Sequence, residues 1–257
     1  MIIYLIVLSF LSSSFISSIS EPETPKTRSS QKPDNPLELI QQMVERYGQE
    51  WYTHLTFDQK TTFYTADGQV ERIQWWYKAL EAPGALAIHF DKKNSGNGIL
   101  FKDGVQYGYA NGQAIQEIYK VHDLLVLGFD IYKQASLKSV EQLRSVGYDM
   151  SKMYSDRWQD KAVWVIGVDS PSDSIAQFWI EQERLLFVRS LKPGRAGIMQ
   201  EVQFNKYEPI KGGWVAPEVI FNMNGQRMLH EEYFNIQVPA TLDSAIINPD
   251  TFLEATW

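Results

Sequence analysis

The feature that most constrains the fold is an alternation of apolar and polar residues that begins after Trp51 and continues towards the C-terminus. In "LTFDQKTTF" (residues 55–63), Leu55, Phe57 and Phe63 share one phase with polar residues between them, which predicts a strand with one wet face. Turn residues separate this run from later ones, as at residues 67–68, 83–84 and 103–104. About eleven short strands follow one another in this way, which predicts an antiparallel sheet.

Three helical segments accompany the strands. Asn35 is a good N-cap and Pro36 fits the first helical position, which predicts an amphipathic helix that ends before Gly48. Two more helices are expected at residues 116–128 and 139–147. Eleven strands in one open sheet would curl strongly. The expected fold is therefore mainly β with helices (α+β): a curled antiparallel sheet in the form of a barrel or half-barrel, with helices on its concave side.

The N-terminal region predicts export. Residues 1–20 are uncharged, apolar at first and then rich in small residues, which predicts a signal peptide cleaved near Ser20 and a periplasmic location. Because no Lys or Arg precedes the apolar stretch, an uncleaved anchor is the alternative. Residues 21–34 are rich in Pro, Ser and charge and read as a linker. Residues 35–257 are then a single domain, with no later stretch suited to stable transmembrane insertion.

Composition excludes several classes of function. The net charge is -7 and the chain contains no basic run, so nucleic acid is not an expected partner. The chain has no Cys, which excludes disulfides, a thiolate nucleophile and Cys-ligated metal sites. We therefore expect the stability of the domain to come from its hydrophobic core.

No catalytic constellation is visible in the sequence. The four histidines lack the spacing of metal ligands, and the usual nucleophile and phosphate-binding motifs are absent. The expected protein is therefore not an enzyme, with no catalytic residue, metal or cofactor. A hydrolase that uses a carboxylate pair in a cleft stays an alternative, because some of the 31 acidic residues will lie close together.

Aromatic residues are the remaining signal, with 8 Trp, 13 Tyr and 13 Phe. In the stretch from Glu71 to Phe90, the alternation assigns Trp75 and Tyr77 to the inner wall and Trp76 to the outer surface. Such residues line a cavity for an apolar ligand or fill the core of a structural or interaction module, and periodicity alone does not separate the two. The residues predicted to line a cavity are Phe57, Phe63, Trp75, Tyr77, Leu86, Ile88, Phe90, Phe101, Tyr107 and Tyr109.

The order of these features resembles the LolA-like lipoprotein-sorting family. "LTFDQKT" (residues 55–61) is similar to the family's Phe-x-Gln strand, and residues 68–90 are similar to its strand, proline turn and strand. "LFKDGVQYGYANG" (residues 100–112) resembles its Asp-Gly strand pair, and "INPDTFLEA" (residues 247–255) resembles its closing segment. Those carriers have an arginine immediately before the turn proline, where this chain has Ala82.

The resemblance implies an unclosed β-barrel with a helical lid and an apolar, aromatic-lined cavity that receives acyl chains. It implies a soluble periplasmic carrier without a cofactor or catalysis, which we expect to act as a monomer. The implied partners are the acyl chains of lipoproteins or lipids, a membrane-bound donor complex and an outer-membrane acceptor. The alanine before the proline leaves the cargo and the handover partners open.

Overall fold

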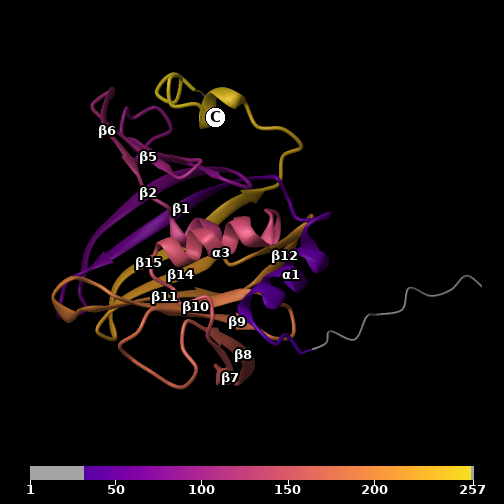
Figure 1. Ribbon diagram of the computed structural model, residues 1–257. Helices are drawn as coiled ribbons and strands as arrows, with labels where there is room; N and C mark the ends of the chain where they lie inside the picture. Colours follow the sequence, from indigo (N-terminus) through magenta and orange to yellow (C-terminus); the bar gives the residue numbers. More distant parts are fainter. Residues whose placement is uncertain (1–31, 256–257) are drawn as a thin grey trace, which may run out of the picture. The chain divides into compact units, whose positions relative to one another are not determined.

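The computed structural model describes residues 32–255 (Figure 1). The predicted signal peptide at residues 1–20 lies outside these residues, as does most of the predicted linker at 21–34. The helices are α1 (Pro36–Tyr47), α2 (Asp123–Gly128), α3 (Ser136–Ser145) and the short 3-10 helices η1 (Asp130–Tyr132), η2 (Arg195–Gly197) and η3 (Ser244–Ile247). The strands are β1 (His54–Tyr64), β2 (Val70–Glu81), β3 (Ala85–Phe90), β4 (Gly98–Lys102), β5 (Val105–Ala110), β6 (Gln113–Tyr119), β7 (Met153–Trp158), β8 (Lys161–Ile166), β9 (Gln177–Glu181), β10 (Phe187–Pro193), β11 (Met199–Asn205), β12 (Glu208–Ile210), β13 (Gly213–Val215), β14 (Glu218–Met223) and β15 (Gln226–Gln237).

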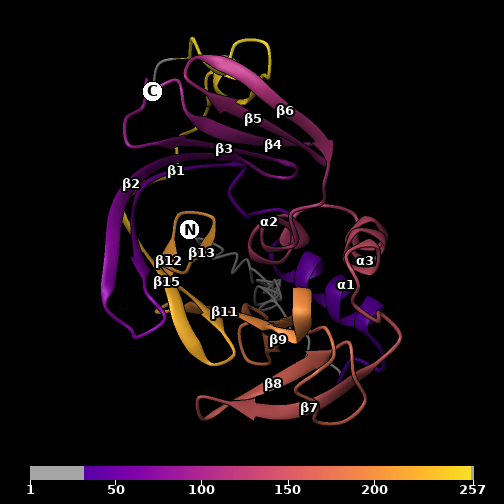
Figure 2. The same ribbon diagram turned by 90° about the vertical axis from the view of Figure 1, so that its left-hand side faces the viewer.

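Thirteen strands form one antiparallel sheet in the order β6-β5-β4-β3-β2-β1-β15-β14-β11-β10-β9-β8-β7, and β12 and β13 form a separate hairpin. Within the described residues β6 and β7 stand at the two ends of this order and do not pair with each other. Figure 2 shows the sheet curled around α1, α2 and α3, which lie on its concave side. The prediction of a mainly β, unclosed antiparallel sheet is confirmed, with more strands than the expected eleven.

The N-terminal helix forms as its sequence predicts. The Asn35 side chain accepts a hydrogen bond from the Glu38 backbone N–H at 3.0 Å, and Pro36 is the first helical residue. Leu39, Ile40 and Met43 are the fully buried stripe of α1, and they pack into the core between the helices and the sheet. The capping residue and the apolar stripe therefore fix both where this helix starts and which face it buries.

The two middle helices differ from the prediction. Residues 113–119 form the edge strand β6, because the Asn111-Gly112 turn folds this segment back onto β5. Helix α2 begins only at Asp123, capped by His122, whose Nδ1 accepts from the Leu125 backbone N–H at 3.3 Å. The expectation of one helix over 116–128 is thus half wrong. Helix α3 begins three residues earlier than predicted. Within residues 32–255, no helix is both long and apolar enough to span a membrane.

The main hydrophobic core lies between the concave face and the helices. Trp51 is buried in it and stacks on Tyr132 and Tyr52, with ring centroids 4.1 and 5.0 Å apart. The Tyr132 hydroxyl oxygen accepts a hydrogen bond from the Phe187 backbone N–H of β10 at 2.9 Å. These contacts join α1, η1 and the sheet into one packed layer.

A second core lies on the convex face, beneath the C-terminal segment. Phe252 is fully buried there, between the rings of His89 and Tyr109 at centroid distances of 4.3 and 4.4 Å. The Lys102 ammonium group donates to the Ile247 carbonyl at 3.0 Å. The closing segment therefore covers the outer side of β3, β4 and β5, and the concave side is left to the helices.

Candidate functional site

The strand register decides which predicted cavity residues share a face. Residues directly opposite each other on paired strands point to the same side of a sheet. Phe57 is opposite Lys78 and Phe63 is opposite Arg72, so the even-numbered residues of β2 belong to the concave face. Trp75 and Tyr77 therefore lie on the convex face, and their predicted placement on the inner wall is wrong. Trp76, predicted to lie outside, faces the concave side and packs against the main core.

The length of the β2–β3 connection explains this reversal. Glu81 is opposite Ala85, so three residues (82–84) join the strands instead of the two that the prediction assumed. One extra residue in the connection moves every side chain of β2 to the other face of the sheet, relative to the side chains of β3. Lys78 is therefore opposite Ile88 and Trp76 is opposite Phe90. Leu86, Ile88 and Phe90 of β3 therefore share the concave face with the even-numbered residues of β2.

The same kind of error affects the predicted tyrosines of β5. The connection after β4 has only two residues, since Lys102 is opposite Val105. Phe101 is therefore opposite Gln106, and Tyr107 is opposite Leu100 in the convex core. Tyr109 also belongs to that core. The predicted placement of both tyrosines with Phe101 is wrong.

Six of the ten predicted residues do come together on the concave face. They are Phe57, Phe63, Leu86, Ile88, Phe90 and Phe101. Four of these are fully buried in the main core, whereas Phe63 and Phe90 are half-buried. The structure thus divides the predicted set into packed core and partly exposed surface.

The partly exposed part continues into strands that the sequence did not connect with it. Trp76 contacts Phe90 and Phe63, with ring centroids 5.1 and 6.2 Å apart. Phe63 is opposite Leu229, which is opposite Phe221. We call these five half-buried residues (Phe63, Trp76, Phe90, Phe221 and Leu229) the concave wall. They form an apolar surface on the inner side of β1, β2, β3, β14 and β15.

A buried ion pair lies beside the concave wall. The Lys78 Nζ atom is 3.7 Å from Glu231 Oε2, and the two side chains are only 9% and 7% exposed. Burial lowers the pKa of Lys78, and the Glu231 carboxylate opposes that shift. The Tyr233 hydroxyl donates to Glu231 Oε2 at 3.2 Å, and Lys78 lies 5.7 Å from the ring centre of Trp76. One carboxylate and nearby aromatic rings therefore hold a cation inside the curl of the sheet.

Two further polar groups at this place are unsatisfied. Gln59 is fully buried, and its Nε2 donates to Thr61 Oγ1 at 2.8 Å. Gln59 Oε1 and Trp76 Nε1 are buried without a hydrogen-bond partner among residues 32–255. This polar cluster was not predicted from the sequence. Its signal was visible only in part, because Gln59 follows Leu55 and Phe57 in one alternating phase, whereas Lys78 belongs to the mostly polar phase of Arg72 and Gln74.

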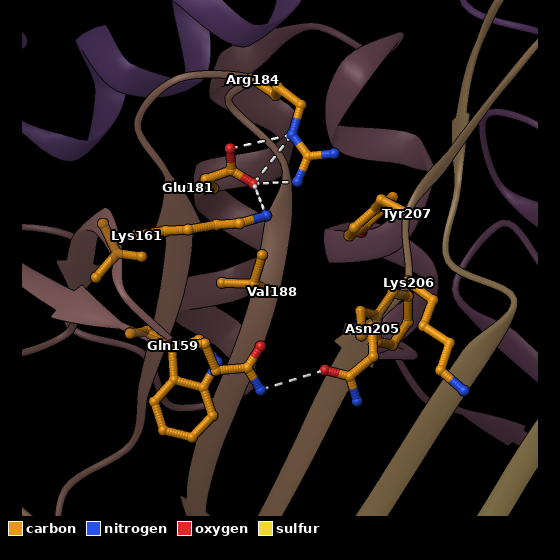
Figure 3. Close-up of a pocket in the computed structure, with 11 residues that line it drawn as sticks. Gln159, Lys161, Glu181, Arg184, Val188, Asn205, Lys206 and Tyr207 are labelled. Atoms are coloured by element: carbon orange, nitrogen blue, oxygen red, sulfur yellow. Dashed lines mark hydrogen bonds and ion pairs between the residues drawn. The ribbon is translucent and has the colours of Figure 1, made fainter.

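A pocket of about 240 Å³ lies elsewhere, along β8, β9, β10 and the end of β11 (Figure 3). Its acidic residue, Glu181, accepts from Arg184 Nε at 3.0 Å and pairs with Lys161 at 3.5 Å. Burial acts to raise the pKa of Glu181, but these two cations hold it below its ordinary value. With one carboxylate, already paired, this pocket does not provide the carboxylate pair of a glycan hydrolase.

A pocket of about 90 Å³ does contain two carboxyl groups, Asp103 and Asp130. This volume is well below the roughly 300–1,000 Å³ of typical ligand sites. The pair therefore gives no support to the hydrolase alternative. Among the described residues, no group of three His, Asp or Glu side chains is placed to hold a metal ion.

No family model and no curated protein matches this sequence. Solved structures do match. A DUF1329 family protein from Desulfovibrio piger has a TM-score of 0.58 at 12% identity, over 83% of this chain and 98% of that one. A domain described as an outer membrane lipoprotein-sorting protein, from Vibrio parahaemolyticus, has a TM-score of 0.56 at 13% identity, over 84% and 97%. A LolA superfamily protein from Nitrosomonas europaea has a TM-score of 0.53 at 11% identity, over 82% and 98%. This chain has the LolA-like fold.

In this LolA-like fold, the proline turn is tied to the helical segment by a contact of its own. The Gly84 backbone N–H donates to Asp130 Oδ1 at 3.1 Å, and Asp130 is 1% exposed. Burial raises the pKa of Asp130 to about 7, with a smaller contribution from the Asp103 carboxylate. The contact joins the β2–β3 turn to η1, which lies between α2 and α3.

Replacing Asp130 by asparagine should stabilise the protein at pH 8 but hardly at pH 3.5. In the unfolded chain this carboxyl group has a pKa of about 4. Because its pKa in the folded protein is higher, its contribution to stability is fully present below about pH 4, where the group is protonated in both states. It is lost as the pH rises through 7, where the buried group ionises. Asparagine keeps the acceptor for Gly84 without the charge, and its gain above pH 7 should be roughly 2–4 kcal/mol.

Urea denaturation at several pH values measures this difference. Asp160→Asn, at an exposed turn position with a positive φ that asparagine tolerates, is the matched control and should show no such trend. A gain in Asp130→Asn that is the same at all pH values would contradict the raised pKa.

Proposed function

We propose that this protein is a carrier or binding protein for the acyl chains of lipids or lipoproteins, and that it performs no catalytic step. The observation that carries the proposal is the concave wall, where half-buried apolar side chains from five strands gather on the inner side of an unclosed sheet. The LolA-like fold supports it, since one of the matching structures is described as an outer membrane lipoprotein-sorting domain.

Apolar contact alone provides enough free energy for such binding. Each methylene removed from water contributes ~0.8 kcal/mol, so ten of them contribute about 8 kcal/mol before the cost of association. With an association cost of about 4 kcal/mol, micromolar affinity requires roughly fifteen buried methylenes, the length of an ordinary acyl chain. The rings of Phe63, Trp76 and Phe90 are neighbours, although the Arg72 guanidinium lies over the Phe63 ring, 3.8 Å from its centre.

The helical segment over residues 123–145 would act as a movable cover. Besides the Asp130 contact, the Lys192 ammonium group binds the Asp123 carboxylate at 2.8 Å and so ties α2 to β10. Opening would also have to separate Tyr132 of the same segment from Trp51 in the main core, and a ligand that favours the open arrangement would supply this free energy and shift the equilibrium towards it. In this proposal the protein works in the periplasm, receives its cargo from a membrane-bound donor and delivers it to the outer membrane.

The test is whether the protein holds acyl chains. Protein purified from membrane-containing cells should show bound lipid in native mass spectrometry, and delipidated protein should bind a fluorescent fatty-acyl probe with micromolar affinity. Unlabelled lipid should displace the probe. If neither lipid nor probe binds, the carrier proposal is wrong, and the structural or interaction module with a filled core becomes the better explanation.

A further inference from the structure

We infer that the concave wall includes a subsite for the polar end of its ligand, formed by Gln59 and Trp76, which selects a hydroxyl group. The ligand class is a neutral lipid in which a hydroxyl is joined to an acyl or alkyl chain. This inference rests on the proposed function, because it concerns the same face of the sheet.

The first observation is that one acceptor and one donor are left unsatisfied on directly opposite residues of paired strands. Gln59 Oε1 is a hydrogen-bond acceptor and the Trp76 indole N–H is a donor, and both are buried without a partner among the described residues. Unpaired buried polar groups are costly and uncommon, so each calls for an explanation. A ligand that pairs with both removes this cost.

The strand register places the two groups close together. Gln59 and Trp76 are directly opposite on β1 and β2, so they share a face, with Cβ atoms about 5 Å apart. A hydroxyl oxygen can accept from the indole N–H while its own hydrogen is donated to Gln59 Oε1. An ether or ester oxygen can satisfy only Trp76. A carboxylate, which has no hydrogen to donate, leaves Gln59 Oε1 unpaired.

The surrounding charges favour a neutral ligand. Lys78 follows Trp76 on the same face of β2, but the Glu231 carboxylate lies 3.7 Å from its ammonium group. Glu231 is itself opposite Thr61, the residue that holds the Gln59 amide. The two opposite charges largely cancel at the subsite. Arg72, also on this face of β2, lies over the Phe63 ring, but it is half exposed and pairs with Glu71, so its charge is screened and an anion gains little net attraction.

The subsite also leads into the apolar surface. Trp76 is a member of the concave wall, and its ring contacts Phe90 at 5.1 Å. A ligand whose hydroxyl lies between Gln59 and Trp76 would lay its chain across these rings. Its polar end would then point into the protein, beside the buried ion pair.

Competition against the fluorescent acyl probe at pH 8 tests the inference with three compounds that carry a twelve-carbon chain: 1-dodecanol, dodecyl methyl ether and dodecanoate. Dodecane is the reference without a polar end. Wild-type protein should bind the alcohol about tenfold more tightly than the ether or the carboxylate, as expected for one additional hydrogen bond. Gln59→Leu, which removes the acceptor, should bring the alcohol-to-ether ratio close to one while ether binding changes by less than about twofold.

Trp76→Phe provides an independent variant, since it keeps an aromatic ring but removes the donor. It should weaken alcohol and ether alike, by about fivefold to tenfold, relative to dodecane. Thermal melting shows whether each variant folds. If one variant fails to fold, the other still tests the hydroxyl subsite. If all three compounds bind wild-type protein equally, or if Gln59→Leu keeps the preference, the hydroxyl subsite is wrong while the carrier proposal stands. If no compound and no probe binds, both are wrong.

Discussion

Replacing Trp76 by glutamate should abolish binding of the fluorescent acyl probe, whereas the same change at Trp75 should leave binding unchanged. Trp76 is in the middle of the concave wall, in contact with Phe63 and Phe90. Glutamate would remove this ring and place a carboxylate on an apolar surface, near the buried carboxylate of Glu231. A loss of about 3 kcal/mol or more corresponds to at least a hundredfold weaker binding.

Trp75 is the matched control because it is the adjacent residue of the same strand with its side chain on the convex face. It is 42% exposed, and its ring contacts Phe234, with centroids 5.7 Å apart. Fluorescence titration measures binding, and circular dichroism shows that each variant is folded. Trp76→Leu, which keeps the site apolar, should bind about tenfold more weakly than wild type if folding fails for the glutamate variant. Loss of binding in Trp75→Glu alone would mean that the ligand occupies the convex face instead.

This pair of residues also shows what the sequence could and could not reveal. Alternation within "ERIQWWYKALE" separates Trp75 from Trp76 correctly, but it does not say which of the two faces inward. That depends on whether each connection contains an odd or even number of residues. The connection before β3 has three residues where two were expected. The connection before β5 has the expected two residues, which places Phe101 and Tyr107 on opposite faces, although the prediction put them on the same one.

Local signals were reliable where one residue fixes the conformation. Asn35 and Pro36 start α1 as predicted, and the turns at Gly68 and Gly104 have the positive φ that glycine permits. The Asn111-Gly112 pair was an equally clear hairpin signal, and its omission caused the wrong helix over residues 116–119.

The polar cluster could not have been predicted by such local signals. Lys78 meets Glu231 only because β1 pairs with β2 on one side and with β15 on the other. The pairing of β1 with the last strand of the sheet is a contact between distant parts of the chain. Alternation identifies both strands, yet nothing in their sequences specifies that they are neighbours of the same strand.

Replacing Lys78 by methionine should destabilise the protein by about 3–5 kcal/mol at pH 8. The change leaves the Glu231 carboxylate buried, with the Tyr233 hydroxyl as its remaining hydrogen-bond donor. Removing one partner of a buried ion pair is costly because the other charge stays in a medium that solvates it poorly. Urea denaturation at pH 8 measures the effect.

The Lys60–Glu232 pair is a control in the adjacent strands, on the opposite face of the sheet. Its N–O distance is 2.9 Å, shorter than that of the buried pair, but its side chains are 33% and 36% exposed. Lys60→Met should therefore cost less than about 1 kcal/mol. Equal losses in Lys60→Met and Lys78→Met would contradict the assignment of the larger effect to burial.

The double variant Lys78→Met with Glu231→Leu separates the cost of a broken pair from the contribution of an intact one. Methionine and leucine remove both charges, so the double variant should recover most of the stability and lie within about 2 kcal/mol of wild type. The Tyr233 hydroxyl would still lose its acceptor, which accounts for a remaining loss of about 1 kcal/mol. A double variant as unstable as Lys78→Met alone would show that the pair itself contributes several kcal/mol. If the double variant recovers its stability, the Lys78–Glu231 pair contributes little to folding. Its presence beside the Gln59 and Trp76 subsite would then need a reason other than stability.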